Sequence, residues 1–206
     1  MLMNQAQTSR PHSFAEVTHS SLSSFHAQSW HWDYFPSFGS LVTVETKQRT
    51  LFGIVYTVQT GSSDAGRYPF TFQKTEEELL AEQPQIFEFL QTTFSCLVVG
   101  FSTNETLVYQ MGPEPAKMHA FVHHATPIQA RHFFASNLYL HLLFNAPEIT
   151  VLDELLLALL RTKKELGLLS AESFLSFAET VSLATGDDYR KLKIFMSRAD
   201  FILNTL

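Results

Sequence analysis

Alternating apolar and polar residues predict a pair of β-strands early in the chain. Residues 41–45 read Leu-Val-Thr-Val-Glu, which places two valines on one face of a strand, since successive side chains point to opposite faces. A polar turn separates them from residues 51–58, which are rich in β-branched and aromatic types. The short turn predicts a β-hairpin, and Gly53 inside the second strand predicts a bulge or a tight bend.

A helical pattern follows this hairpin. Residues 75–78, Thr-Glu-Glu-Glu, match a capping box, in which the threonine and the third helical residue satisfy each other's backbone N–H groups. Pro84 is tolerated in a first helical turn, so a helix can restart there. Apolar residues then recur with helical spacing, which predicts one helical stripe made by Ile86, Phe87, Leu90 and Phe94.

The pattern changes character after residue 126. Before this point, short apolar segments predict three more strands, at residues 95–101, 107–111 and 120–123. After it, periodic segments bounded by Pro, Asn and Gly predict four helices, at residues 129–144, 150–166, 171–184 and 188–203.

These segments indicate how the chain is organised. We expect an α+β protein with a small N-terminal β-barrel and a crossing helix at residues 30–126, followed by a C-terminal helical bundle at residues 127–206. Residues 1–29 are rich in Ser, Gln, Thr and His and show no apolar periodicity. Too little apolar surface can be buried there to offset the entropy of ordering. We expect a disordered or weakly ordered lead, with an organelle address or a docking segment as the alternatives.

Composition narrows the class of protein. The chain of 206 residues has 45% hydrophobic residues, 13% aromatic residues and a net charge of −6. These values exclude an intrinsically disordered chain, which lacks aromatics, and give no overall attraction to nucleic acid. A single cysteine, Cys96, excludes an internal disulfide framework and a multi-cysteine zinc site. Apolar runs fall short of the ~18 residues that a membrane helix needs, so we expect a soluble protein of the cytoplasm, or of an organelle stroma in a eukaryote.

Motifs of known catalytic chemistry are missing from the sequence. It contains no GxxxxGK[ST] phosphate loop, no GxGxxG fingerprint and no GxSxG nucleophile elbow. Cys96 lies in an apolar strand without a positive neighbour, which is typical of an inert buried thiol. His119, His123 and Glu114 are the first candidates for an unfamiliar enzyme pocket, but a strand would hold the two histidines ~13 Å apart. We predict no catalytic residue, no cofactor and no metal site.

Two short basic clusters leave open a role with nucleic acid. They lie late in the predicted helices, where cations suit the negative end of the helix dipole. A nucleic-acid surface is usually denser and set in a basic domain. The alternative of an accessory factor to a translocase or nuclease predicts salt-sensitive binding that depends on Arg161, Lys163, Lys164, Arg190 and Lys191.

Aromatic residues are the most unusual feature of the chain. Five of them fall within residues 30–38, just before the first predicted strand: Trp30, Trp32, Tyr34, Phe35 and Phe38. One interpretation is a lid that is buried against the barrel. The other is a partner-binding surface, since Trp and Tyr are enriched in binding hot spots. Full burial of both indoles would exclude the partner-binding surface.

Four stretches, taken in order, resemble the HAS-barrel family. They are Phe-Gly-Ser-Leu-Val-Thr-Val at residues 38–44, the strand at residues 52–60, the Gln-Pro-Gln-Ile-Phe helix with its flanks at residues 82–94, and Leu-Val-Val-Gly-Phe at residues 97–101. The family includes small β-barrels at the N-termini of HerA-type hexameric translocases and of the α and β subunits of rotary ATP synthase. It also includes stand-alone proteins of cyanobacteria and plastid-bearing lineages.

The resemblance implies a role in assembly. In the ATPases the barrel joins subunits, in the translocase it docks a partner nuclease, and no catalytic residue of the family lies in it. No ATPase domain follows the barrel in this sequence, which departs from that pattern. We therefore expect a non-catalytic interaction or assembly protein. It would dock through the rim of its barrel or through the surface of residues 30–38, onto an oligomeric partner such as an ATPase or onto another copy of itself.

Overall fold

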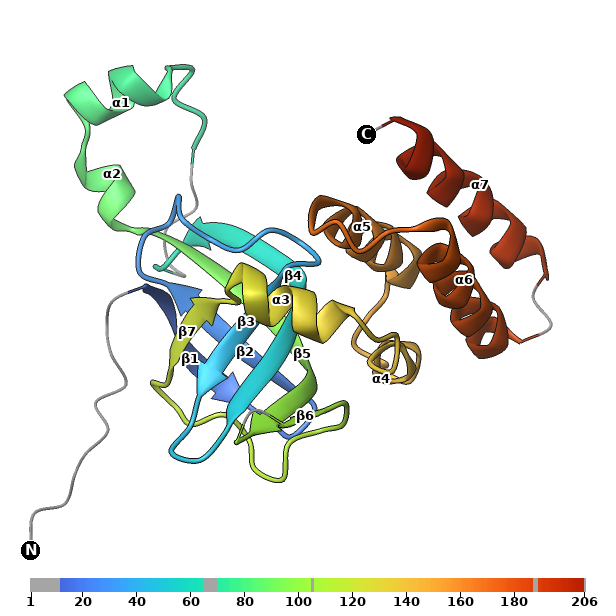
Figure 1. The fold of residues 1–206 in the computed structure, drawn as a ribbon. Coiled ribbons are helices and arrows are strands. Elements are labelled where there is room, and N and C mark those ends of the chain that lie inside the picture. Colours follow the sequence, from blue (N-terminus) through green and yellow to red (C-terminus); the bar gives the residue numbers. More distant parts are fainter. Residues whose placement is uncertain (1–11, 65–69, 105, 187–188, 206) are drawn as a thin grey trace, which may run out of the picture.

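The first half of the chain forms a closed β-barrel in a computed structural model that describes residues 12–64, 70–104, 106–186 and 189–205 (Figure 1). Its strands are β1 (Ser13–Ser20), β2 (Ser24–Ser29), β3 (Leu41–Glu45), β4 (Thr50–Ser62), β5 (Leu90–Thr103), β6 (Thr106–Val108) and β7 (Phe121–His124). They form one antiparallel sheet in the order β2-β1-β7-β3-β4-β5-β6, and β2 also pairs with β5. This extra pairing closes six strands into a ring and removes the open edges of the sheet, while β6 extends β5 outside the ring.

The structure corrects the expectation of an unordered lead. Residues 13–29 form β1 and β2, which pair with each other and, on either side, with β7 and β5. Phe14, Phe25 and Ala27 are buried in the barrel core. Most polar residues of these strands stay at least partly exposed, with Ser29 as the exception, so the strand pattern was hidden in a serine-rich composition. Residues 1–11 lie outside the part that the structure describes.

The predicted β3–β4 hairpin and the bulge at Gly53 are confirmed. The two strands pair antiparallel over five residue pairs. The register between β4 and β5 shifts between Phe52 and Gly53. A Cβ on Gly53 would come within 2.8 Å of Phe25 Cε1, so the missing side chain lets the strand pass close to this ring.

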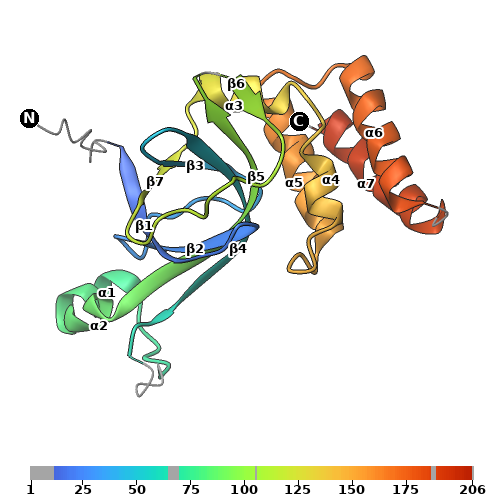
Figure 2. The ribbon, with the colours of Figure 1, turned by 90° about the horizontal axis from the view of Figure 1, so that it is seen from below.

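The helical segment between β4 and β5 is shorter than predicted. Thr75 forms the predicted capping box of α1 (Glu76–Glu82), but α2 (Gln85–Glu88) makes about one turn only. Leu90 and Phe94 belong to β5 instead, because a spacing of four residues fits one face of a strand as well as one face of a helix. Neither helix crosses the barrel, since α1 and α2 lie beyond its end (Figures 1 and 2).

The second half of the chain is helical, with α3 (Pro127–Phe134), α4 (Leu140–Phe144), α5 (Leu152–Glu165), α6 (Ala171–Thr185) and α7 (Tyr189–Thr205). The single helix predicted for residues 129–144 is wrong, because the chain breaks between α3 and α4. Lys163 of α5 stabilises the break: its Nζ donates to the carbonyl oxygen of Phe134 and to Oδ1 of Asn137, both at 2.8 Å. A helix end needs such partners because its last carbonyls have none within the helix.

Two hydrophobic clusters hold these elements together. One fills the inside of the barrel. The other joins the outer face of β3, β4 and β5 to the helices, and it includes Ile54, Leu97, Phe134, Leu156 and Phe177. The helices therefore pack on one side of the barrel through a shared core (Figure 2). Within the described ranges, no helix combines the length and the apolar character needed to cross a membrane.

Candidate partner-binding surface

The aromatic loop, residues 30–38, joins β2 to β3 across one end of the barrel (Figure 1). Its backbone is held by neighbouring strands. The N–H of Trp30 donates to the carbonyl oxygen of Phe14 at 2.9 Å. The hydroxyl of Thr92 donates to the carbonyl oxygen of Trp32. The barrel thus sets the position of the loop, and the aromatic side chains are presented from a supported backbone.

Gly39 holds the far end of the loop against helix α5. Its φ of 79° lies in the left-handed region that favours glycine. Its N–H donates to the carbonyl oxygen of Val55 at 2.8 Å. A Cβ at this position would lie 2.7 Å from the Cβ of Ala158, which is closer than two carbons can pack. Both the backbone angle and the close approach of α5 therefore require glycine here.

Four of the five aromatic side chains in the loop are exposed. The exposed fraction is 41% for Trp30, 54% for Tyr34, 43% for Phe35 and 36% for Phe38. Trp32 is half-buried. The loop is therefore not a buried lid, and burial does not exclude a partner-binding surface.

Trp30 and Tyr34 pack against different residues of β7. Trp30 packs edge-on against Phe121, with 5.6 Å between the ring centroids. Tyr34 packs edge-on against Phe14 and His124, each at 5.8 Å. Burial lowers the pKa of His124, which favours the neutral imidazole beside these rings. Phe121 and His124 are three positions apart in β7 and therefore point to opposite faces of the strand, so the two rings occupy separate places on the barrel.

The other aromatic residues of the loop face different neighbours. Trp32 turns to Phe87 of α2, at 5.7 Å between centroids. Phe38 lines a groove of about 670 Å³ together with α5 and α7. The structure therefore holds these rings on one loop but does not gather the five predicted residues into one cluster.

This groove was missed in the sequence. We call it the α5–α7 groove and define it by Phe38, Leu157, Ala158, Arg161, Phe201 and Ile202. The ion pair between Arg198 and Glu154, with 2.7 Å between Nη2 and Oε1, lies along it. Helical spacing alone places Leu157, Ala158 and Arg161 on one face of α5. Only the packing of α7 and the loop beside that face creates a groove.

The candidate enzyme residues do not contact one another in the described part of the chain. His119 is exposed, and its Nδ1 lies 3.4 Å from Oε2 of Glu16. His123 is half-buried in β7 opposite Thr43. Glu114 is exposed. Among the residues that the structure describes, no group of three or more His, Cys, Asp or Glu side chains is placed to hold a metal ion.

A polar contact on the barrel wall was also missed. Ser95 Oγ lies 2.7 Å from His26 Nδ1, and Tyr56, whose pKa is raised by burial, bonds to Ser95 as well. A nucleophilic serine needs a histidine that a third group orients. The ring of His26 also lies beside that of His19, at 5.7 Å between centroids, but no described carboxylate bonds to it, so the cluster is a polar contact between β2, β4 and β5. It could not be predicted because β2 itself was not.

Cys96 has the inert character that its sequence context predicts. The thiol lies inside the barrel and is fully buried. Burial raises the pKa of the Cys96 thiol well above its usual range, so the reactive thiolate is disfavoured.

The basic residues do not form the common surface that a nucleic-acid role requires. Lys163 is 2% exposed, and burial lowers the pKa of its ammonium group to about 8. Lys164 is half-buried and donates to a backbone carbonyl of α7 at 2.9 Å. Arg161 and Arg190 are exposed on α5 and α7, and the side chain of Lys191 lies outside the described residues. Lys163 is therefore not available on the surface and Lys164 is available only in part, while salt-sensitive binding that depends on the five basic residues stays a prediction.

Comparison with known proteins does not decide between these functions. A scan against protein-family models finds no match to this chain, and a search of curated proteins finds none either. The HAS-barrel resemblance therefore stays a prediction from the sequence.

Proposed function

We propose that this protein is a non-catalytic interaction or assembly protein that docks onto another protein through one end of its β-barrel. The observation that carries the proposal is the aromatic loop. Trp30, Tyr34 and Phe35 each keep at least 41% of their surface exposed, although the loop backbone is bonded to the barrel.

Exposed aromatic rings on a supported backbone are suited to binding. Trp and Tyr bury a large area with few rotatable bonds, and they dominate the energetics of many interfaces. Little further ordering of the loop is needed when a partner covers it, so less entropy is lost on association. In this proposal the helices act as a bundle that supports the loop at Gly39.

The proposed partner is a protein and not a nucleic acid. The HAS-barrel resemblance suggests its class, an oligomeric ATPase or a related assembly. The net charge of −6 and the burial of Lys163 speak against a nucleic-acid partner.

A photo-crosslinking experiment tests the proposal in cells of the native host. Phe35 is replaced by p-benzoylphenylalanine in the full chain, and covalent adducts are identified by mass spectrometry. The control carries the same group at Ile128, which is 80% exposed on α3, away from the loop. We expect one protein to be captured reproducibly from Phe35 and not from Ile128.

The affinity for the captured protein then provides the decisive measurement. Trp30→Ala with Tyr34→Ala should weaken binding by roughly thirtyfold, as expected for two residues of a hot spot. Ile128→Ala should leave binding unchanged. No reproducible adduct at Phe35, or equal binding by the double variant and the wild type, would overturn the proposal.

A further inference from the structure

We propose that a second copy of this chain docks helix α1 into the α5–α7 groove, so that copies associate head to tail. The inference goes beyond docking through the aromatic loop and does not require it, since only Phe38 belongs to both surfaces. The inference rests on two exposed features of the described chain, helix α1 and the α5–α7 groove.

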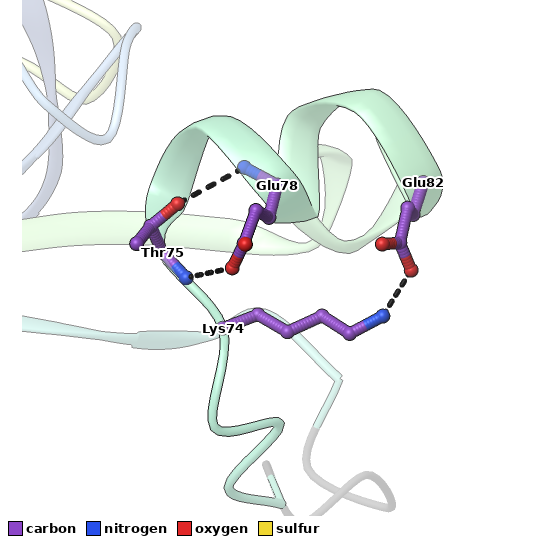
Figure 3. A network of polar contacts seen from close by, with 4 residues as sticks. All are labelled: Lys74, Thr75, Glu78 and Glu82. Atoms are coloured by element: carbon purple, nitrogen blue, oxygen red, sulfur yellow. Dashed lines mark hydrogen bonds and ion pairs between the residues drawn. The ribbon is translucent and has the colours of Figure 1, made fainter.

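Helix α1 is held by its own caps but covered by nothing in the described chain. None of its residues is buried, and Leu80 is 48% exposed. Its first turn is closed by the capping box: the N–H of Glu78 donates to Thr75 Oγ1 at 3.2 Å, and the N–H of Thr75 donates to the Glu78 carboxylate at 2.8 Å (Figure 3). A helix this short is marginal in water without tertiary packing. A second molecule that covered its leucines would supply that packing.

One face of α1 combines apolar surface with a free negative charge. Residues three and four apart share a helix face, so Glu76 lies beside Leu79 and Leu80. Glu78 and Glu82 are engaged within their own segment, by Thr75 and Lys74 (Figure 3). Glu76 has no hydrogen bond or ion pair with any described residue. Glu77, three residues before Leu80, likewise has no hydrogen bond or ion pair with any described residue. This face therefore presents two leucines and two unpaired carboxylates.

The α5–α7 groove presents the complementary set. Leu157 lines it from α5, and Phe201, which is 69% exposed, lines it from α7. Arg161 lies one turn after Leu157, is exposed, and has no partner among the residues that the structure describes. The charge of Arg198 is already matched by Glu154. One unpaired guanidinium beside apolar walls is thus complementary in charge to the unpaired carboxylates beside the leucines of α1, and Glu76 is the one that lies next to both leucines.

The occupant has to come from another copy. Figures 1 and 2 place α1 and the pair α5 and α7 on opposite sides of the barrel, so α1 cannot reach the groove of its own chain. The contact joins two different surfaces and is therefore heterologous. Such contacts build rings or open chains and not two-fold dimers.

A charge exchange tests the contact in the full-length protein by sedimentation velocity over a wide range of micromolar concentrations. The wild type should associate beyond a dimer. Glu76→Arg and Arg161→Glu should each weaken association by about tenfold or more, because each places like charges across the contact. The double variant should recover association because the ion pair is restored with its sign reversed. An equimolar mixture of the two single variants should also recover it, because alternating copies form the native ion pair at one contact and the reversed ion pair at the next.

Matched controls separate the contact from net charge and from folding. Glu172→Arg on α6 and Arg190→Glu on α7 make the same charge changes at other exposed positions and should associate as the wild type does. Leu80→Ser should weaken association without changing any charge. A wild type that stays monomeric, single variants that associate normally, or a double variant that does not recover would overturn the inference. All these variants keep Trp30, Tyr34 and Phe35, so failure here and failure of the aromatic-loop proposal are separate results.

Discussion

Residues 13–29 and residues 30–38 follow each other in the chain and use their apolar side chains in opposite ways. The first segment is serine-rich, yet Phe14 and Phe25 are at most 3% exposed. The second is the most aromatic stretch of the protein, yet Tyr34 is 54% exposed. Burial of these two segments therefore depends on strand pairing and not on the local density of apolar residues.

The physical cause of the contrast is the closed barrel. β1 and β2 have a partner on each side, so their alternate side chains must enter the barrel whether or not the outward residues are polar. Residues 30–38 run over the end of the barrel, and four of their five aromatic side chains stay exposed there. Exposed aromatics in such a loop suggest a binding role more strongly than apolar residues in a core do.

The largest expected effect on stability comes from removing one aromatic ring from each of the two segments in turn. Phe25→Ala removes a fully buried ring that packs against Gly53, and we expect the free energy of unfolding to fall by about 3–5 kcal/mol. Tyr34→Ala removes an exposed ring and should change it by less than about 1 kcal/mol. Urea denaturation followed by tryptophan fluorescence measures both. Equal losses of unfolding free energy in the two variants would show that the two segments do not differ in burial.

A smaller effect on stability is expected at Gly39, where the loop is held against α5. Gly39→Ala should lower the free energy of unfolding by about 1–3 kcal/mol, because of the φ of 79° and the 2.7 Å approach to Ala158. Gly61→Ala is the control, since an added Cβ there meets nothing within 4 Å. Equal stability of the two variants, measured in the same urea titration, would show that the loop is not fixed against α5.

The smallest effect concerns Lys163, a charged residue that the helical half buries. Burial lowers its pKa from 10.5 to about 8, so between these pH values the unfolded chain keeps a proton that the folded chain has lost. With respect to this group the unfolded state then binds more protons, so the contribution of Lys163 to stability rises as the pH increases from about 8 to about 10.5. The Cys96 thiol and the buried tyrosines, whose pKa values are raised, act in the opposite direction, so the contribution of Lys163 is read from the difference between wild type and variant.

Lys163→Met should remove this rise while leaving all other titrating groups in place. Urea midpoints measured across that pH range for both proteins provide the test. The same pH dependence in the variant and the wild type would contradict the assignment of the buried ammonium group.

Local patterns were sufficient to predict part of the fold. The β3–β4 hairpin, the bulge at Gly53 and the capping box at Thr75 involve only nearby residues, and each was found where expected. The pattern was ambiguous at Leu90 and Phe94, where one spacing fits both a helix and a strand. It was misleading at residues 13–29, where serine-rich outward faces hid two strands.

The candidate site was predictable in composition but not in arrangement. The density of aromatic residues singled out Trp30, Trp32, Tyr34, Phe35 and Phe38, and four of them are exposed. Nothing in the sequence separates Trp32, which turns to α2, from Phe38, which turns to α5 and α7. The α5–α7 groove could not be predicted from the sequence, since its walls come from three distant segments: the loop, α5 and α7.

The sequence by itself determined the hairpin, the caps and most of the helices, because turn chemistry, capping and side-chain periodicity act between residues a few positions apart. Tertiary structure alone decided the closure of the barrel by β2 and β5 and the division of α3 from α4. At the break between α3 and α4, Lys163 donates a hydrogen bond to the carbonyl oxygen of Phe134, 29 residues earlier in the chain. These features depend on pairings between distant parts of the chain, which form only when the whole core closes around them.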